Sequence, residues 1–109
     1  PASVDSIPTS LGQEDHVSMG SISALKLLDV MQNVEHVLAV ELLTAAQALD
    51  FREPLRPGRG VEAAHKALRG VVAHAHRDYE VRNDLDRCAA LLRDGAMTRA
   101  AAAGGSELS

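Results

Sequence analysis

One long amphipathic stretch constrains the fold more than any other feature of the chain. Between residues 17 and 51, apolar side chains recur at steps of three and four, which is the spacing of one helix face. The side chains on this face are Leu28, Met31, Val34, Leu38, Leu42, Ala45 and Leu49. Pro54 and Pro57 follow, and proline does not continue a helix. We therefore expect one helix over 17–51.

This helix is long for a chain of 109 residues. A helix of about 31 residues is about 46 Å long, whereas a compact domain of this size is roughly 34 Å across. In the second half, Val40, Thr44 and Ala48 lie opposite the apolar face, so this half is expected to be buried all round. We therefore expect other parts of a longer polypeptide, or other subunits, to cover it.

The rest of the chain predicts shorter helices and no strand, which makes the fold class all-α. Residues 1–12 carry two prolines, three serines, a threonine and a glycine, and residues 1–16 are expected to form an opening loop. Two shorter helices are expected within 61–95, at about 61–76 and 85–93. Residues 100–109 are mostly alanine, glycine and serine, offer little side-chain area for burial, and are expected to fray.

Composition excludes several classes of protein. Eleven basic and fifteen acidic side chains give a net charge of −4, which argues against nucleic acid as a partner. The lone Cys88 cannot form an internal disulfide, so we expect a cytoplasmic setting. No apolar run approaches the ~20 residues needed to cross a bilayer, since Glu41 and Gln47 interrupt the best candidate. The first residue, Pro1, suggests a piece of a longer polypeptide.

The densest polar cluster is the run Gln13, Glu14, Asp15 and His16, where the opening loop meets the long helix. Such junctions expose unpaired backbone N–H groups and can direct a side chain toward a cleft, where a carboxylate can accept a proton or bind a cationic group. The alternative is that Glu14 and Asp15 only complement the positive end of the helix dipole. Spacing alone favours this alternative.

Three other polar groups are candidates of lower rank. His74 and His76, near Asp78, would point about 200° apart on a helix, which is wrong for a shared ligand shell, so we expect surface histidines and no metal site. Cys88 lies on the apolar face of its helix and is expected in the core. Glu41 either pairs with another helix or is solvated.

Three arginines, Arg52, Arg56 and Arg59, follow the long helix and could bind an anion. Glu53 lies among them and no glycine-rich phosphate cradle is present, so the pattern is more typical of a solvated loop. The sequence also lacks a nucleophilic triad and a paired CxxC motif.

The run VDSIPTSLGQEDHVSMG at residues 4–20 closely resembles the segment that opens the C-terminal part of histidine ammonia-lyases. The resemblance continues through residues 33–35, 37–41 and 45–51, which covers roughly the first half of the chain. Later residues resemble the family's closing region less closely. The Pro-Asp-Ile often found there is replaced by Arg-Asn-Asp-Leu at 82–85, which leaves the register of the last helices open.

The resemblance implies an elimination that converts L-histidine to trans-urocanate and ammonia. The electrophile in this family is 4-methylidene-imidazol-5-one, which forms from an internal Ala-Ser-Gly. That tripeptide is absent here, since Ala2 and Ser3 are followed by Val4, so the 109 residues alone are expected to be inactive. The resemblance also implies that Glu14 is catalytic and binds substrate near its imidazole, with Gln13 as a substrate-binding residue beside it.

Phenylalanine ammonia-lyases instead carry Asn-Gln-Asp at this motif, so Gln13, Glu14 and Asp15 favour histidine. A carboxylate can pair with an imidazole N–H, whereas beside a phenyl ring it would be an unpaired, desolvated charge. The resemblance further implies a homotetramer around a bundle of long helices, with residues 1–109 forming a C-terminal helical segment. Two alternatives remain, namely a related aromatic amino acid lyase or aminomutase, and a non-enzymatic helical oligomerisation module.

Overall fold

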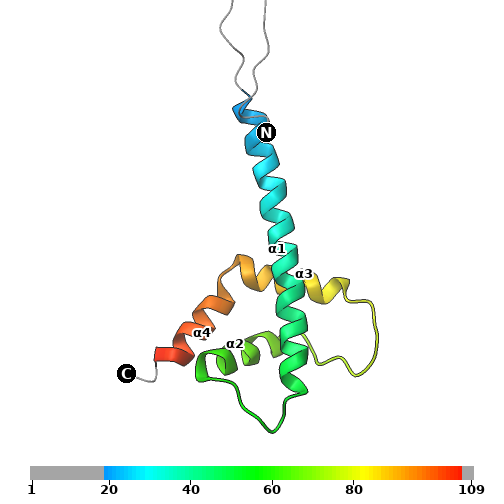
Figure 1. Cartoon of the computed structure of the whole chain (residues 1–109), viewed down its shortest axis with the longest axis vertical. Coiled ribbons are helices and arrows are strands. Elements are labelled where there is room, and N and C mark those ends of the chain that lie inside the picture. Colours follow the sequence, from blue (N-terminus) through cyan, green and yellow to red (C-terminus); the bar gives the residue numbers. More distant parts are fainter. Residues whose placement is uncertain (1–18, 107–109) are drawn as a thin grey trace, which may run out of the picture. The chain divides into compact units, whose positions relative to one another are not determined.

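The computed structural model describes residues 19–106, and in this range it contains four helices and no strand (Figure 1). The helices are α1 (Gly20–Asp50), α2 (Arg59–Arg69), α3 (Arg82–Arg93) and α4 (Ala96–Ser106). The chain divides into two compact units, residues 1–34 and 35–109, and α1 contributes to both. The all-α class expected from the sequence is confirmed, with one more helix than was expected.

The predicted long helix is present as α1, which has 31 residues. It begins at Gly20 and ends at Asp50, inside the expected range of 17–51. Just beyond it, the backbone N–H of Arg52 donates to the carbonyl of Leu49, so the chain leaves the helix in a tight turn. The prolines beyond Arg52 lack the N–H that a continued helix would need.

In the first unit, the described residues 19–34 carry mostly exposed apolar side chains. Leu25 is 64% exposed and Met31 is 60% exposed, and their apolar neighbours are similar. The exposed members of this set are Ile22, Leu25, Leu27, Leu28, Val30, Met31 and Val34. So many exposed large apolar side chains on one helical segment are typical of a surface that packs against another part of a protein.

In the second unit, the buried face of α1 differs from the predicted one. Ala39 and Ala46 are buried and Leu42 packs against them, whereas Leu38 remains 44% exposed and Val40 47% exposed. Small alanine side chains let the neighbouring segments approach the helix closely, so the core forms along them rather than along the larger leucines. Within the described part of the second unit this half of α1 is therefore only partly buried, and its cover by other parts of a longer polypeptide or by other subunits stays a prediction.

The second predicted helix ends earlier than expected. The range 61–76 was predicted, but α2 ends at Arg69, and Gly70 closes it by donating its N–H to the carbonyl of Lys66. Residues 70–81 contain no helix. They form the segment that connects α2 to α3.

The prediction that residues 100–109 fray is wrong for the part that the structure describes. Residues up to Ser106 belong to α4, which runs beside α2 (Figure 1). A Cβ atom at Gly104 would lie 2.6 Å from the Cβ of Ala63 and 2.7 Å from the carbonyl oxygen of Arg59. Gly104 thus lets the backbone of α4 pack closely against α2. The sequence prediction considered only large apolar side chains and could not detect this contact.

Helix α3 spans Arg82–Arg93 and so begins three residues before the predicted start. Gly95 follows with a φ of 74°, a conformation that glycine adopts without strain. The carboxylate of Asp94 accepts a hydrogen bond of 2.8 Å from the N–H of Ala96. The chain therefore turns at Gly95 and starts α4 instead of ending there.

The core of the second unit lies where the helices meet the 70–81 segment. Leu68, Val72 and Cys88 are its largest fully buried side chains, which confirms the core placement of Cys88. Ala39, Ala46, Ala89 and Met97 complete it. Within residues 19–106, no helix combines the length and the apolar character that crossing a membrane requires.

Candidate functional site

The most organised polar feature of the described chain surrounds Asp50, the last residue of α1. Its carboxylate accepts hydrogen bonds from His65 Nε2 at 2.7 Å, Arg69 Nη2 at 2.6 Å and His74 Nδ1 at 2.7 Å. Together with Gln47, we call these residues the Asp50 cluster. It joins the end of α1 to α2 and to the 70–81 segment.

Gln47 binds the backbone of the 70–81 segment. Its Nε2 donates to the carbonyl of Ala75 at 2.8 Å, and its Oε1 accepts from the N–H of Ala75 at 3.1 Å. Arg69 Nη1 donates to the carbonyls of Val72 at 3.2 Å and Ala73 at 3.1 Å. These bonds satisfy backbone groups of a segment that has no helix or sheet partner.

Helix periodicity explains how the Asp50 cluster assembles. Gln47 and Asp50 are three residues apart and share a face of α1, while His65 and Arg69 are four apart and share a face of α2. The side chains of Asp50 and Arg69 are only 18% and 15% exposed. A carboxylate at a helix C-terminus faces the negative end of the helix dipole, so its cationic partners are needed there.

The hydrogen bonds to Asp50 also set its pKa. Partial burial alone would raise its pKa, but hydrogen bonds from His74, Arg69 and His65 outweigh burial and lower the pKa from 3.8 to about 2. A carboxylate with three donors is a weak base at neutral pH. The Asp50 cluster therefore serves to position chain segments and is a poor candidate for proton transfer.

The expectation that His74 is a surface histidine is wrong. It is half-buried, hydrogen-bonded to Asp50, and its ring lies 5.7 Å from that of Phe51 and 4.7 Å from that of His76. The helical spacing assumed for His74 and His76 does not apply, because α2 ends at Arg69. Among residues 19–106, no group of three or more His, Cys, Asp or Glu side chains is arranged to hold a metal ion.

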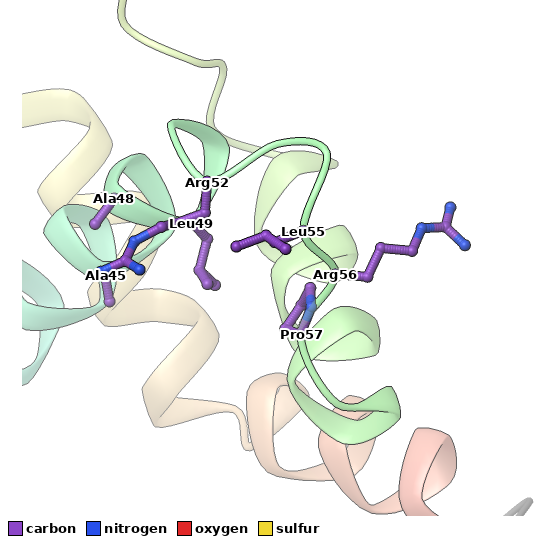
Figure 2. Close-up of a pocket in the computed structure, with 7 residues that line it drawn as sticks. All are labelled: Ala45, Ala48, Leu49, Arg52, Leu55, Arg56 and Pro57. Atoms are coloured by element: carbon purple, nitrogen blue, oxygen red, sulfur yellow. The ribbon is translucent and has the colours of Figure 1, made fainter.

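A second feature is an apolar groove of about 480 Å³ beside the end of α1 (Figure 2). Its lining residues are Ala45, Ala48, Leu49, Arg52, Leu55, Arg56 and Pro57. In Figure 2 the Leu55 side chain points toward Leu49, and Arg52 runs back toward Ala45, whereas Arg56 extends the other way. We call this feature the Arg52 groove.

Arg52 and Arg56 are exposed, as expected for a solvated loop, whereas Arg59, also exposed, is the first residue of α2. Arg56 lies 3.8 Å from a carboxylate oxygen of Glu62, a distance at which an exposed ion pair contributes little. Glu41 is also exposed within the described residues, and its pairing with a helix outside them stays a prediction.

The residues with the strongest sequence signal, Gln13 and Glu14, lie in the range 1–18, outside the described residues. Their catalytic and substrate-binding roles stay predictions. The sequence analysis missed the Asp50 cluster. A polar pair three residues apart on a largely apolar helix, Gln47 and Asp50, was the signal that could have revealed it.

The sequence of this chain is similar to those of aromatic amino acid lyases. The family described as aromatic amino acid lyase matches residues 1–70. A histidine ammonia-lyase of Sorangium cellulosum is 56% identical over 100 residues, covering 92% of this chain and 20% of the relative. One from an Anaeromyxobacter strain is 52% identical over 97 residues, covering 89% of this chain and 19% of the relative. The chain thus spans about a fifth of these relatives' length.

Two solved structures share the fold. The crystal structure of histidine ammonia-lyase from Trypanosoma cruzi superposes with a TM-score of 0.87 at 44% identity, covering 93% of this chain and 20% of that one. Tyrosine aminomutase from Streptomyces globisporus superposes with a TM-score of 0.83 at 36% identity, covering 95% of this chain and 20% of that one.

Proposed function

This chain belongs to the aromatic amino acid lyase family, and from that premise we propose that it is the C-terminal part of a histidine ammonia-lyase. The full-length enzyme eliminates ammonia from L-histidine and releases trans-urocanate in histidine degradation. The observation that carries this proposal is the identity of 56% and 52% to relatives named histidine ammonia-lyase.

In this proposal Glu14 and Gln13 are the chain's contribution to the active site. The Glu14 carboxylate accepts a hydrogen bond from an imidazole N–H of the substrate and favours its protonated form, which orients histidine for elimination. Gln13 contributes amide hydrogen bonds beside it. The chemical match between a carboxylate and an imidazole supports this assignment, since a phenyl ring offers no such partner.

The family's electrophile, 4-methylidene-imidazol-5-one, has no source in these residues. It forms from Ala-Ser-Gly, and here Ala2 and Ser3 are followed by Val4. In a longer polypeptide that contains this tripeptide, the group would supply the electrophile for the departure of the amino group. The 109 residues alone therefore supply substrate contacts and packing surface, and we expect them to be inactive.

We propose as partners the remainder of the lyase polypeptide and further subunits, in a homotetramer. The exposed apolar side chains of α1, such as Leu25 and Val37 at 64% and 65% exposure, support this because an assembly would cover them. The buried free thiol of Cys88 fits a reducing, cytoplasmic compartment.

A related aminomutase is the second candidate, because the tyrosine aminomutase structure also superposes well, with a TM-score of 0.83. Its identity of 36%, against 44% for the histidine ammonia-lyase structure, makes it the weaker one.

The test is turnover by the full-length protein with L-histidine, L-tyrosine and L-phenylalanine in parallel. Absorbance of urocanate reports the histidine reaction, and chromatography reports aryl acrylates and β-amino acids from the other two. The proposal expects urocanate from histidine with little conversion of the others. Conversion of tyrosine or phenylalanine in preference to histidine would establish the second candidate instead.

A further inference from the structure

The Arg52 groove combines an apolar floor with an unpaired cation. Across residues 19–106, no hydrogen bond or ion pair engages the Arg52 guanidinium, whereas the neighbouring Arg56 faces Glu62. Figure 2 shows Arg52 lying along the α1 side of the groove, while the Arg56 side chain extends away from it. Arg52 is therefore the cation available to an occupant of this groove.

Large apolar side chains at and beside the groove are mostly exposed to solvent. Leu55, which lines the groove, is 70% exposed, and Phe51, which precedes Arg52 in the sequence but is not a lining residue, is 73% exposed. Removing such side chains from water is favourable in proportion to the apolar area covered. A suitable occupant thus presents an apolar side chain to Leu49 and Leu55 and a carboxylate to Arg52, a pairing that suits the planar guanidinium.

The length of the relatives provides a source for such an occupant. This chain covers only 20% of the Sorangium relative and 20% of the Trypanosoma cruzi structure, so about four fifths of a protein of that size lies outside these residues. A covalently linked segment reaches the groove at a high effective concentration, which a free small acid does not.

We propose that the Arg52 groove is the docking site for a segment of the longer polypeptide outside residues 1–109. That segment inserts an apolar side chain between Leu49 and Leu55 and pairs a carboxylate with Arg52. The inference rests on the proposed function in one respect, that the chain is part of a longer lyase. The docked segment would bring the end of α1, and with it the Asp50 cluster, into contact with the rest of the enzyme.

The first test is thiol accessibility in the full-length protein. Leu55→Cys and, as an exposed control, Glu80→Cys are treated with a maleimide, and peptide mass spectrometry follows each new thiol in native and denatured protein. We expect native protein to react about 100-fold more slowly than denatured protein at position 55, as for a site reached only through local opening, and similar rates at position 80. Adding Arg52→Glu should abolish most of the protection.

The second test identifies the carboxylate. Arg52→Lys places an amine at the groove, and a carbodiimide joins amines to carboxylates in direct contact. We expect a cross-link from position 52 to an Asp or Glu outside residues 1–109. Arg77→Lys is the matched control and should give none to that carboxylate.

Three outcomes overturn the proposal. The first is equal labelling of native and denatured protein at position 55, which would mean an open groove suited at most to a free acid. The second is a cross-link that joins position 52 only to residues within 1–109, which would indicate a second copy of this region. The third is the absence of any cross-link. Each of these readouts is independent of urocanate production, so a failure here is distinct from a failure of the proposed function.

Discussion

The Asp50 carboxylate accepts a 2.6 Å hydrogen bond from Arg69, and the two residues are the last residues of α1 and α2 respectively. Both helices thus end at the same charge pair, and His74 adds the 70–81 segment to it through a further bond of 2.7 Å. Because these side chains are mostly buried, each partner depends on the others for compensation of its lost hydration. The loss of the Asp50 carboxylate should therefore destabilise the second unit.

We predict that Asp50→Asn destabilises the full-length protein by about 2–4 kcal/mol, because it leaves the Arg69 cation buried without its counter-charge. The measurement is chemical or thermal unfolding of the variant beside Asp86→Asn. Asp86 is exposed on α3, so its substitution should change stability by less than about 0.5 kcal/mol. Equal stability of the two variants would show that the Asp50 cluster contributes little.

The lowered pKa of Asp50 predicts a pH dependence. A carboxyl whose pKa falls from 3.8 unfolded to about 2 folded stabilises the protein above pH 4. This contribution, about 2 kcal/mol, is lost as the pH falls from 4 toward 2. Unfolding measured across this range should show a steeper loss of stability for the wild type than for Asp50→Asn. Parallel curves would contradict the pKa shift.

The sequence predicted the helices well where large apolar side chains or prolines carry the signal. Helix α1 and its end before Pro54 are examples, since a stripe and a helix breaker are local properties. The choice of buried face was less accurate, because Ala39 and Ala46 are buried for the close approach they allow. Helix α4 was missed for the same reason, since its contact at Gly104 involves almost no side chain.

For the candidate site too, local sequence patterns revealed some features, whereas contacts made by tertiary packing were missed. Asp50 and Arg69 are brought together by tertiary packing across 19 positions of sequence, which no local period encodes. Cys88 was placed correctly because its position on an apolar helix face is a local property. Glu14 was identified from a motif, and its role stays a prediction.

The contact between α4 and α2 predicts opposite results for two adjacent glycines. Gly104→Ala forces a Cβ to within 2.7 Å of the Arg59 carbonyl oxygen, so we expect a loss of about 1–3 kcal/mol. Gly105→Ala meets nothing within 4 Å and should be neutral or stabilising by up to about 1 kcal/mol. Melting temperatures of the two variants give the comparison. A destabilising effect at Gly105 equal to that at Gly104 would argue against the packed α4.

Burial predicts that the Cys88 thiol is inert. Desolvation raises its pKa, with the nearby Asp84 charge acting in the same direction, so little thiolate forms at neutral pH. We expect Cys88 in native protein to resist maleimide for hours while it reacts within minutes after denaturation. Fast labelling of the native protein would mean that this core opens readily.

The measurement that tests the central claim most directly is histidine turnover by the full-length enzyme with Glu14→Gln. The substitution keeps the size of the side chain and removes the charge that is proposed to bind the imidazole. We expect urocanate formation to fall by orders of magnitude, roughly 100-fold or more, while the melting temperature stays near that of the wild type. Near-normal turnover of L-histidine by this variant would contradict the assignment of Glu14 to the active site.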